Sequence, residues 1–152
     1  MIKRSIALVI REPEGSRAGA GCGPARSWLL VRRPDDDADL PGVWGLPAGT
    51  LDADETAQGL VRRIGRGKLG IEVEPGAVVA TGAADRAAYR LDMELWTATI
   101  LDGVPNVEAS PVHGGDQTRY AAWKWDDPSA LEEGAREGSL CCRLGVELAR
   151  GF

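Results

Sequence analysis

The sequence predicts an α+β fold in which a mixed β-sheet is packed between helices. Three features indicate it: a continuous apolar run near the N-terminus, a central segment with helical spacing, and a long alternating segment after it. The predicted order is strands, a central helix, further strands and a terminal helix, which is an α+β arrangement. The 152 residues, 43% of them hydrophobic, suffice for one core, so we expect a single domain over residues 1–152.

Two strands are predicted in the first third of the chain. Ile6–Ile10 is a continuous apolar run with the composition of a buried strand, and Trp28–Arg33 has that of a second strand. Between them, the Gly-, Ala-, Ser- and Arg-rich segment Gly15–Arg26 is expected to be a flexible hairpin connection, since no Gly-Lys-Ser/Thr follows its glycines. The acidic run at 35–39 favours a solvated loop over a divalent cation site.

The strongest helical signal extends from Thr56 to Lys68. Apolar residues recur there at i, i+3, i+4 and i+7 and so share one helix face: Ala57, Leu60, Val61 and Ile64. Thr56 is the expected N-cap and Gly70 the expected stop. Internal glycines cost about 1 kcal/mol each relative to alanine, so this helix should depend on tertiary packing.

Alternation predicts the strands of the second half. Within Ala88–Leu101, one face carries Leu91, Met93 and Leu95, and the other carries Arg90, Asp92, Glu94 and Trp96. Val78–Gly82 and Tyr120–Trp125 are expected to be shorter strands. Ser139 is expected to cap a final helix whose apolar side holds Leu140, Leu144 and Leu148.

Charge and composition exclude several classes of function. With 18 basic and 23 acidic residues the net charge is −5, a poor match for a protein that binds a nucleic-acid polymer, although a small anionic ligand needs only a local basic cluster. No apolar run approaches the roughly 18 residues of a membrane-spanning helix, and the N-terminal run is too short for a secretory signal. Cys141 and Cys142 would diverge on a helix, so a disulfide framework is not expected. We therefore expect a cytoplasmic, reduced protein with no membrane partner.

The segment Pro41–Gly49, with the sequence PGVWGLPAG, leads directly into the central helix and resembles the approach to a Nudix box. Counted from Gly49, the chain supplies Glu55, Arg63, Gly70 and Ile71 at the spacing of that family's motif. The resemblance covers nearly the whole chain and implies a Nudix fold, an α/β/α sandwich. It also implies an activity, the cleavage of a pyrophosphate bond in a nucleoside diphosphate linked to another group. The pair matching Glu55 and Arg63 braces the loop and helix in the family.

Four positions depart from the family motif. The three glutamates that the family uses to hold a divalent metal and activate water are replaced by Ile64, Gly67 and Lys68, and the aliphatic position is Gly65. Ile64 continues the apolar stripe, Gly67 offers no ligand, and the ammonium of Lys68 would repel a cation. Metal-dependent hydrolysis by the usual route, which uses a metal-bound water, is thus predicted to be weak or absent.

The first of three functional hypotheses is a module that binds a nucleotide or another diphosphate compound without turnover. Its expected ligand-binding residues are Lys68, Arg63 and Glu94. Lys68 is the clearest of them, because a lysine ammonium contacts phosphate as a point charge. The alternative interpretation of Lys68 is an exposed lysine favoured by the helix dipole. No cofactor is expected under this hypothesis.

The second hypothesis is a diphosphohydrolase with relocated ligands. Mg²⁺ or Mn²⁺ would then be held by oxygens near the box or on the long strand: the Ala48 carbonyl, Asp52, Asp54 and Glu55, with Asp92 or Glu94. Asp52 and Asp54 are more often turn residues, and Asp92 and Glu94 more often belong to a solvated strand face.

The third hypothesis is a non-catalytic scaffold, which would expose an apolar patch that its tryptophans could supply. His113 could act as a base from its loop or simply be exposed. Tyr89, Trp96 and Tyr120 could stack on a base or lie in the core or at its rim. The sequence does not indicate a substrate or an oligomeric state, although the resemblance allows a homodimer.

Overall fold

The computed structural model describes residues 1–13, 27–37, 40–107 and 120–151. Its strands are β1 (Ile2–Ile10), β2 (Trp28–Arg32), β3 (Trp44–Gly45), β4 (Ala48–Thr50), β5 (Glu72–Asp85), β6 (Arg90–Asp102) and β7 (Ala122–Asp126). Its helices are α1 (Ala57–Ile64), a π-helix (Gly65–Leu69), a 3-10 helix (Pro128–Leu131), α2 (Glu132–Arg136) and α3 (Leu140–Ala149). The α+β class is confirmed. The predicted loop Gly15–Arg26 lies outside the described residues.

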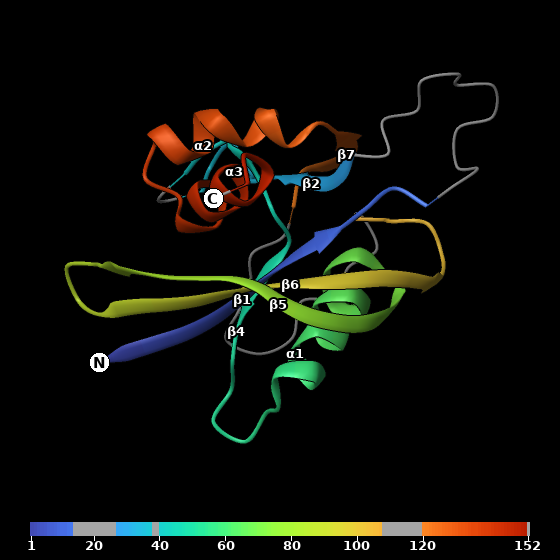
Figure 1. The fold of residues 1–152 in the computed structure, drawn as a ribbon, viewed down its shortest axis with the longest axis horizontal. Helices are drawn as coiled ribbons and strands as arrows, with labels where there is room; N and C mark the ends of the chain where they lie inside the picture. The colour runs from blue at the N-terminus through green and yellow to red at the C-terminus, as the bar shows by residue number, and fades with distance from the viewer. Residues whose placement is uncertain (14–26, 38–39, 108–119, 152) are drawn as a thin grey trace.

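The described strands form two sheets, where the sequence indicated one. The larger has the order β4-β1-β6-β5 and the smaller β3-β2-β7. The larger sheet is mixed, because β1 runs parallel to β6 and antiparallel to β4, while β5 and β6 form an antiparallel hairpin. The N-terminal strand and the tip of this hairpin lie side by side, with the Arg90 amide donating to the Met1 carbonyl at 2.9 Å (Figure 1).

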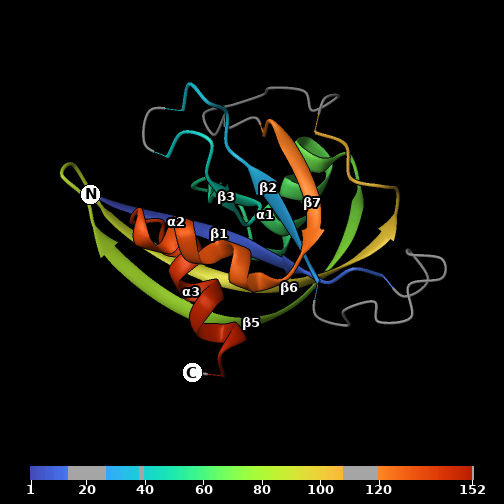
Figure 2. The same cartoon turned by 90° about the horizontal axis from the view of Figure 1, so that it is seen from above.

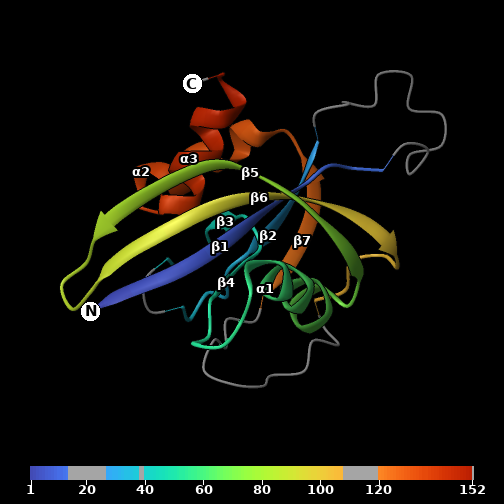
Figure 3. The ribbon, with the colours of Figure 1, turned by 60° about the horizontal axis from the view of Figure 1, so that its bottom comes forward.

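Helices cover both faces of the larger sheet. In Figures 1 and 3, α1 lies on one face and α2 and α3 on the other. Seen from above, the smaller sheet stands beside the larger one, with β7 at its outer edge (Figure 2). The approach of α3 to β5 is close: a Cβ on Gly82 would lie 2.7 Å from Leu144 Cδ2, so a side chain at position 82 would force Leu144 to move.

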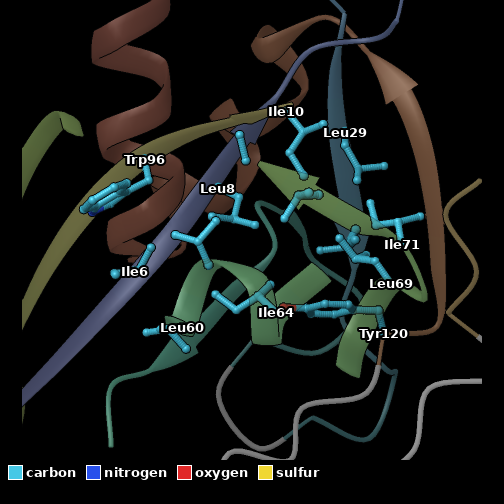
Figure 4. Packing of buried hydrophobic residues seen from close by; sticks show 14 of the residues in the cluster. Ile6, Leu8, Ile10, Leu29, Leu60, Ile64, Leu69, Ile71, Trp96 and Tyr120 are labelled. Carbon is cyan, nitrogen blue, oxygen red and sulfur yellow. The ribbon is translucent and has the colours of Figure 1, made fainter. Parts of the chain in front are cut away.

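The apolar run of β1 is explained by burial on both of its faces. Ile6, Leu8 and Ile10 belong to the core cluster under α1, whereas Ala7 and Val9 belong to the cluster under α3. Successive strand residues point to opposite faces, so a strand between two helical layers must be apolar throughout. Figure 4 shows the first cluster, in which Leu60 and Ile64 of α1 meet β1.

The central helix is regular for only part of its predicted length. Thr56 caps α1, its side chain accepting from the Gly59 amide at 3.0 Å, but the α-helix ends at Ile64 and continues as the π-helix. Gly70, with φ +65°, ends the segment as predicted. The glycines at 65 and 67 make a regular helix weaker there, which is consistent with the wider turn.

The remaining differences concern strand lengths and short elements. β1 and β5 extend well beyond their predicted apolar segments, since backbone pairing with β6 continues through polar residues and through irregularities between Pro75 and Ala80. The final helix and its Ser139 cap are confirmed. In the part of the chain that the structure describes, no helix is long and apolar enough to cross a membrane.

Candidate functional site

An ion pair holds the loop after β4 against α1. Arg63 Nε donates to Glu55 Oε2 and Arg63 Nη2 to Glu55 Oε1, both at 2.8 Å, and Nη2 also donates to the Thr50 carbonyl at 2.8 Å. The Arg63 guanidinium therefore lowers the pKa of Glu55 below its ordinary value. The expected ion pair is thus present, and it fixes the entry of the chain into α1.

The helix face after Arg63 is partly apolar and partly open. Ile64 is 1% exposed and packs in the core, where Figure 4 shows Tyr120 lying beside it. Gly67 offers no side chain, and a Cβ placed there would meet no atom within 4 Å. Position 67 therefore has room for a side chain, whereas position 64 is part of the core.

Lys68 is buried, not exposed as one interpretation of the sequence had it. It is 9% exposed, and its ammonium donates to the Ala48 carbonyl at 2.6 Å and lies 5.5 Å from the centre of the Tyr120 ring. The Tyr120 hydroxyl in turn accepts from the Ala48 amide at 3.0 Å and donates to the Ala48 carbonyl at 3.2 Å. A backbone carbonyl that was a candidate metal ligand thus holds an ammonium.

A cavity of about 600 Å³, here called the large cavity, opens beside Lys68. It lies between the α3-side face of the larger sheet, the segment 45–50, the β5–β6 hairpin and the turn between α2 and α3. Its described charged lining consists of four cations and one carboxylate: Lys3, Arg33, Lys68, Arg86 and Glu137. Arg33 is also paired with Asp37, at 3.0 Å. A chain of net charge −5 thus presents a locally basic cavity.

The box carboxylates and Glu94 do not converge on the Ala48 carbonyl. The side chain of Asp52 is 75% exposed and 3.8 Å from Arg63 Nη2, and Asp54 is exposed. Asp92 and Glu94 line a different cavity of about 480 Å³, here called the second cavity. There Asp92 pairs with Arg90 at 2.9 Å, and Glu94 accepts from Trp96 Nε1 at 3.0 Å.

Other predicted site residues are separated by the fold. Gly49 lines the large cavity, whereas Arg63 and Gly70 do not. Tyr89 lines the large cavity, Trp96 is buried in the core, and Tyr120 does both. None of the five tryptophans is exposed, and His113 lies outside the described residues. Among residues 1–13, 27–37, 40–107 and 120–151, no group of three or more His, Cys, Asp or Glu side chains could hold a metal ion.

Cys141 is a cavity residue that the sequence did not single out as functional. It lies in the first turn of α3, and its Sγ is 3.4 Å from the Ser139 hydroxyl. Hydrogen bonding with Cys142 lowers the pKa of Cys141 against the opposing effect of burial, with smaller lowering contributions from Ser139, from the Leu46 backbone and from the charge of Arg33. Lys3, Arg33 and Arg86 were missed as well, because each joins the cavity from a separate element.

The chain matches a known domain family in sequence and several known proteins in fold. The family model described as the NUDIX domain matches residues 2–140. The MutT protein from Methanosarcina mazei Go1 is 17% identical with a TM-score of 0.67, covering 98% of this chain and 93% of that one. The Escherichia coli ORF135 protein is 25% identical with a TM-score of 0.57, covering 86% and 78%. An ADP-ribose pyrophosphatase from Streptococcus suis is 17% identical with a TM-score of 0.59, covering 98% and 92%. A search of curated protein sequences found no match.

Proposed function

The chain belongs to the Nudix family, whose domain model matches residues 2–140, and from this premise we propose that it binds a nucleoside diphosphate-linked compound in the large cavity, with metal-dependent hydrolysis weak or absent. The observation that carries this proposal is the 2.6 Å contact between the Lys68 ammonium and the Ala48 carbonyl. It puts an ammonium at the cavity wall, at a position where the family's glutamates would otherwise hold a metal ion.

The charge of the large cavity supports an anionic ligand. Among the residues that the structure describes, four basic side chains and one carboxylate line it, although the chain as a whole carries a net charge of −5. A basic cleft with low-dielectric walls attracts anions more strongly than the same charges on an open surface. The similar protein from Streptococcus suis is named an ADP-ribose pyrophosphatase, and ADP-ribose is a nucleoside diphosphate compound of this ligand class.

The residues beside Ala48 do not fit a divalent cation held in the family's way. An ammonium already donates to the Ala48 carbonyl, Ile64 is buried in the core, and Gly67 has no side chain. A cation at the same carbonyl would be repelled by the ammonium, and Mg²⁺ usually requires one or two carboxylates. The proposed function therefore includes no step through a metal.

The chain's own residues supply a metal-free way to hold a phosphate. Ala48 and the Tyr120 ring orient the Lys68 ammonium, and a phosphate in the cavity accepts a hydrogen bond from it. Hydrogen bonds between charged partners are short and strong when the donor is held in place. Binding therefore needs no chelatable ion, and no water molecule is activated.

Calorimetric titration of the full chain with ADP-ribose, with and without EDTA, tests the proposal. We expect equal affinity in both, and a loss of about 10- to 100-fold in Lys68→Met, because a charged hydrogen bond contributes roughly 1.5–3 kcal/mol. Arg62→Met is the matched control: it removes the same charge from an exposed position of α1 and should leave the affinity unchanged. Affinity that disappears with EDTA, or that survives Lys68→Met, would overturn the proposal.

The competing hypothesis of an active diphosphohydrolase is tested by phosphate release with Mg²⁺ over a panel of nucleoside diphosphate compounds. We expect no release above the rate without enzyme. Turnover that EDTA abolishes in wild-type protein would favour relocated metal ligands instead.

A further inference from the structure

The large cavity is also basic near the β5–β6 hairpin. Lys3 of β1 and Arg86 of the β5–β6 hairpin line it, together with Tyr89. The Lys3 ammonium lies 4.5 Å from the centre of the Tyr89 ring, and Arg86 Nη2 donates to the Gly138 carbonyl at 3.1 Å. These contacts orient two cations from different elements towards one end of the cavity.

Neither cation is paired with a carboxylate of the residues that the structure describes. Within the described part of the chain, no ion pair of Lys3 or Arg86 with an acidic side chain occurs; Glu137, the acidic residue of the cavity lining, makes none with them. An arginine has five N–H donors, so the bond to Gly138 leaves capacity for another acceptor.

The pairing of the strands gives the separation of the two basic regions along β1. Ala48, which holds Lys68, pairs with Ala7 of β1, and Lys3 is four residues earlier on the same strand. At about 3.3 Å per residue, the two levels of the cavity are roughly 13 Å apart along β1. This distance is larger than a single diphosphate group.

The surface between the two ends is largely uncharged. Ser5, Leu91 and Met93 line the cavity between the level of Ala7 and that of Lys3, since Lys3 pairs with Leu91 and Ser5 with Met93. The central part of a ligand therefore meets mostly apolar side chains, and its charged groups meet the ends.

We propose that Lys3 and Arg86 form a second anion subsite, so that the ligand is a diphosphate compound with a further phosphate group about 13 Å from the diphosphate. This inference rests on the proposed function, because it takes the first anion to bind beside Lys68. Two cations that converge from separate elements suit a phosphate, which accepts several hydrogen bonds at once.

Synthetic probes with anions at controlled separation test the subsite directly. Decane bisphosphonate carries two anionic ends on a chain long enough to span the cavity, ethane bisphosphonate has the same ends close together, and decylphosphonate keeps the chain but has one anionic end. Calorimetric titration at low salt, where exposed charges are least screened, compares their affinities. We expect decane bisphosphonate to bind at least about fivefold more tightly than either of the other probes.

Variants assign the gain to the proposed residues. Lys3→Met combined with Arg86→Met should reduce the affinity for decane bisphosphonate to that for decylphosphonate and leave ethane bisphosphonate unaffected. Arg4→Met is the matched control, since Arg4 neighbours Lys3 on β1 but lines the second cavity, and it should change nothing. All three residues are exposed, so the variants should fold.

The outcomes separate this inference from the proposed function. If all three probes bind equally and only Lys68→Met weakens them, the second subsite is wrong and the first remains. If decane bisphosphonate binds best but the double variant does not alter it, the subsite is again wrong. If no probe binds the wild-type protein although ADP-ribose does, the subsite is wrong and the proposed function stands; if ADP-ribose does not bind either, both fail.

Discussion

The Lys68 ammonium and the Ala48 carbonyl oxygen are 2.6 Å apart, although the two residues are separated by twenty positions in the chain. The contact joins the end of the central helical segment to strand β4. It places the Lys68 ammonium beside the large cavity, held by backbone and by the face of Tyr120. A lysine in this position can replace the charge of a metal ion but not its ability to activate water.

Exchanging that cation for carboxylates should create a metal site. In Gly67→Glu/Lys68→Glu, two carboxylates and the Ala48 carbonyl could share one ion, and hard cations such as Mn²⁺ prefer such oxygen ligands. We expect Mn²⁺ affinity at least about tenfold above that of the wild-type protein, measured by titration calorimetry. Arg62→Glu, which adds a carboxylate on an exposed position of α1, should give no gain. A folded double variant without Mn²⁺ affinity would mean that the box is aligned incorrectly.

Adding a third glutamate at position 64 should instead destabilise the fold. Ile64 is 1% exposed within the core, so Ile64→Glu removes a packed side chain and buries a carboxylate. We expect a loss of at least about 3 kcal/mol in the free energy of unfolding, determined in urea. Gly67→Glu, which enters open space, should change it by less than about 1 kcal/mol. Similar values for the two variants would contradict the packing described for Ile64.

Elements with a local cause were predictable from the sequence. The run Ile6–Ile10, the stripe that contains Leu60 and Ile64, and the caps Thr56 and Ser139 all lie where their patterns indicated. Each of these features depends on neighbours within a few residues. The pairing of Glu55 with Arg63 was also predictable, because the family resemblance implied that these two residues brace the loop and helix.

Features that depend on contacts between distant segments were not predictable. The burial of Lys68 requires a π-helix and the approach of Ala48 and Tyr120, and no local pattern encodes either. Alternation correctly placed Asp92 and Glu94 on one face of β6, but it could not tell which face borders the large cavity. The opposite face borders it, so Glu94 and Lys68 line different cavities.

The pair of Glu55 and Arg63 should make stability depend on acid pH. The pKa of Glu55 is lowered in the folded state by its hydrogen bonds from Arg63, so the folded protein binds fewer protons there than the unfolded chain. The contribution is present above the ordinary pKa of about 4.5 and is lost as the pH falls through the lowered value. Glu55→Gln should therefore cost about 1–3 kcal/mol at neutral pH and progressively less in acid.

Urea unfolding from neutral pH to below pH 4 measures this dependence. Glu72→Gln is the control, because Glu72 pairs with Arg66 at 2.7 Å but both side chains are largely in solvent. Exposed pairs of this kind contribute little, so its unfolding curve should stay close to that of the wild-type protein. A difference between Glu55→Gln and wild type that does not shrink in acid would show that the ion pair is not its source.

Cys141 should ionise at a lower pH than an ordinary thiol. Hydrogen bonding with Cys142 and Ser139 lowers its pKa against the opposing effect of burial, and its position in the first turn of α3 also favours the anion. In a Cys22→Ser background, the rate of alkylation by iodoacetamide should rise with a midpoint below that of an ordinary thiol, which is about 8.5. Peptide mass spectrometry identifies the alkylated cysteine. Cys142→Ala removes the largest stabilising contact and should move the midpoint upward.

Since Cys141 lines the large cavity, decane bisphosphonate should slow its alkylation in wild-type protein but not in Lys68→Met. Protection that is equal in both would place the bound anion away from Lys68.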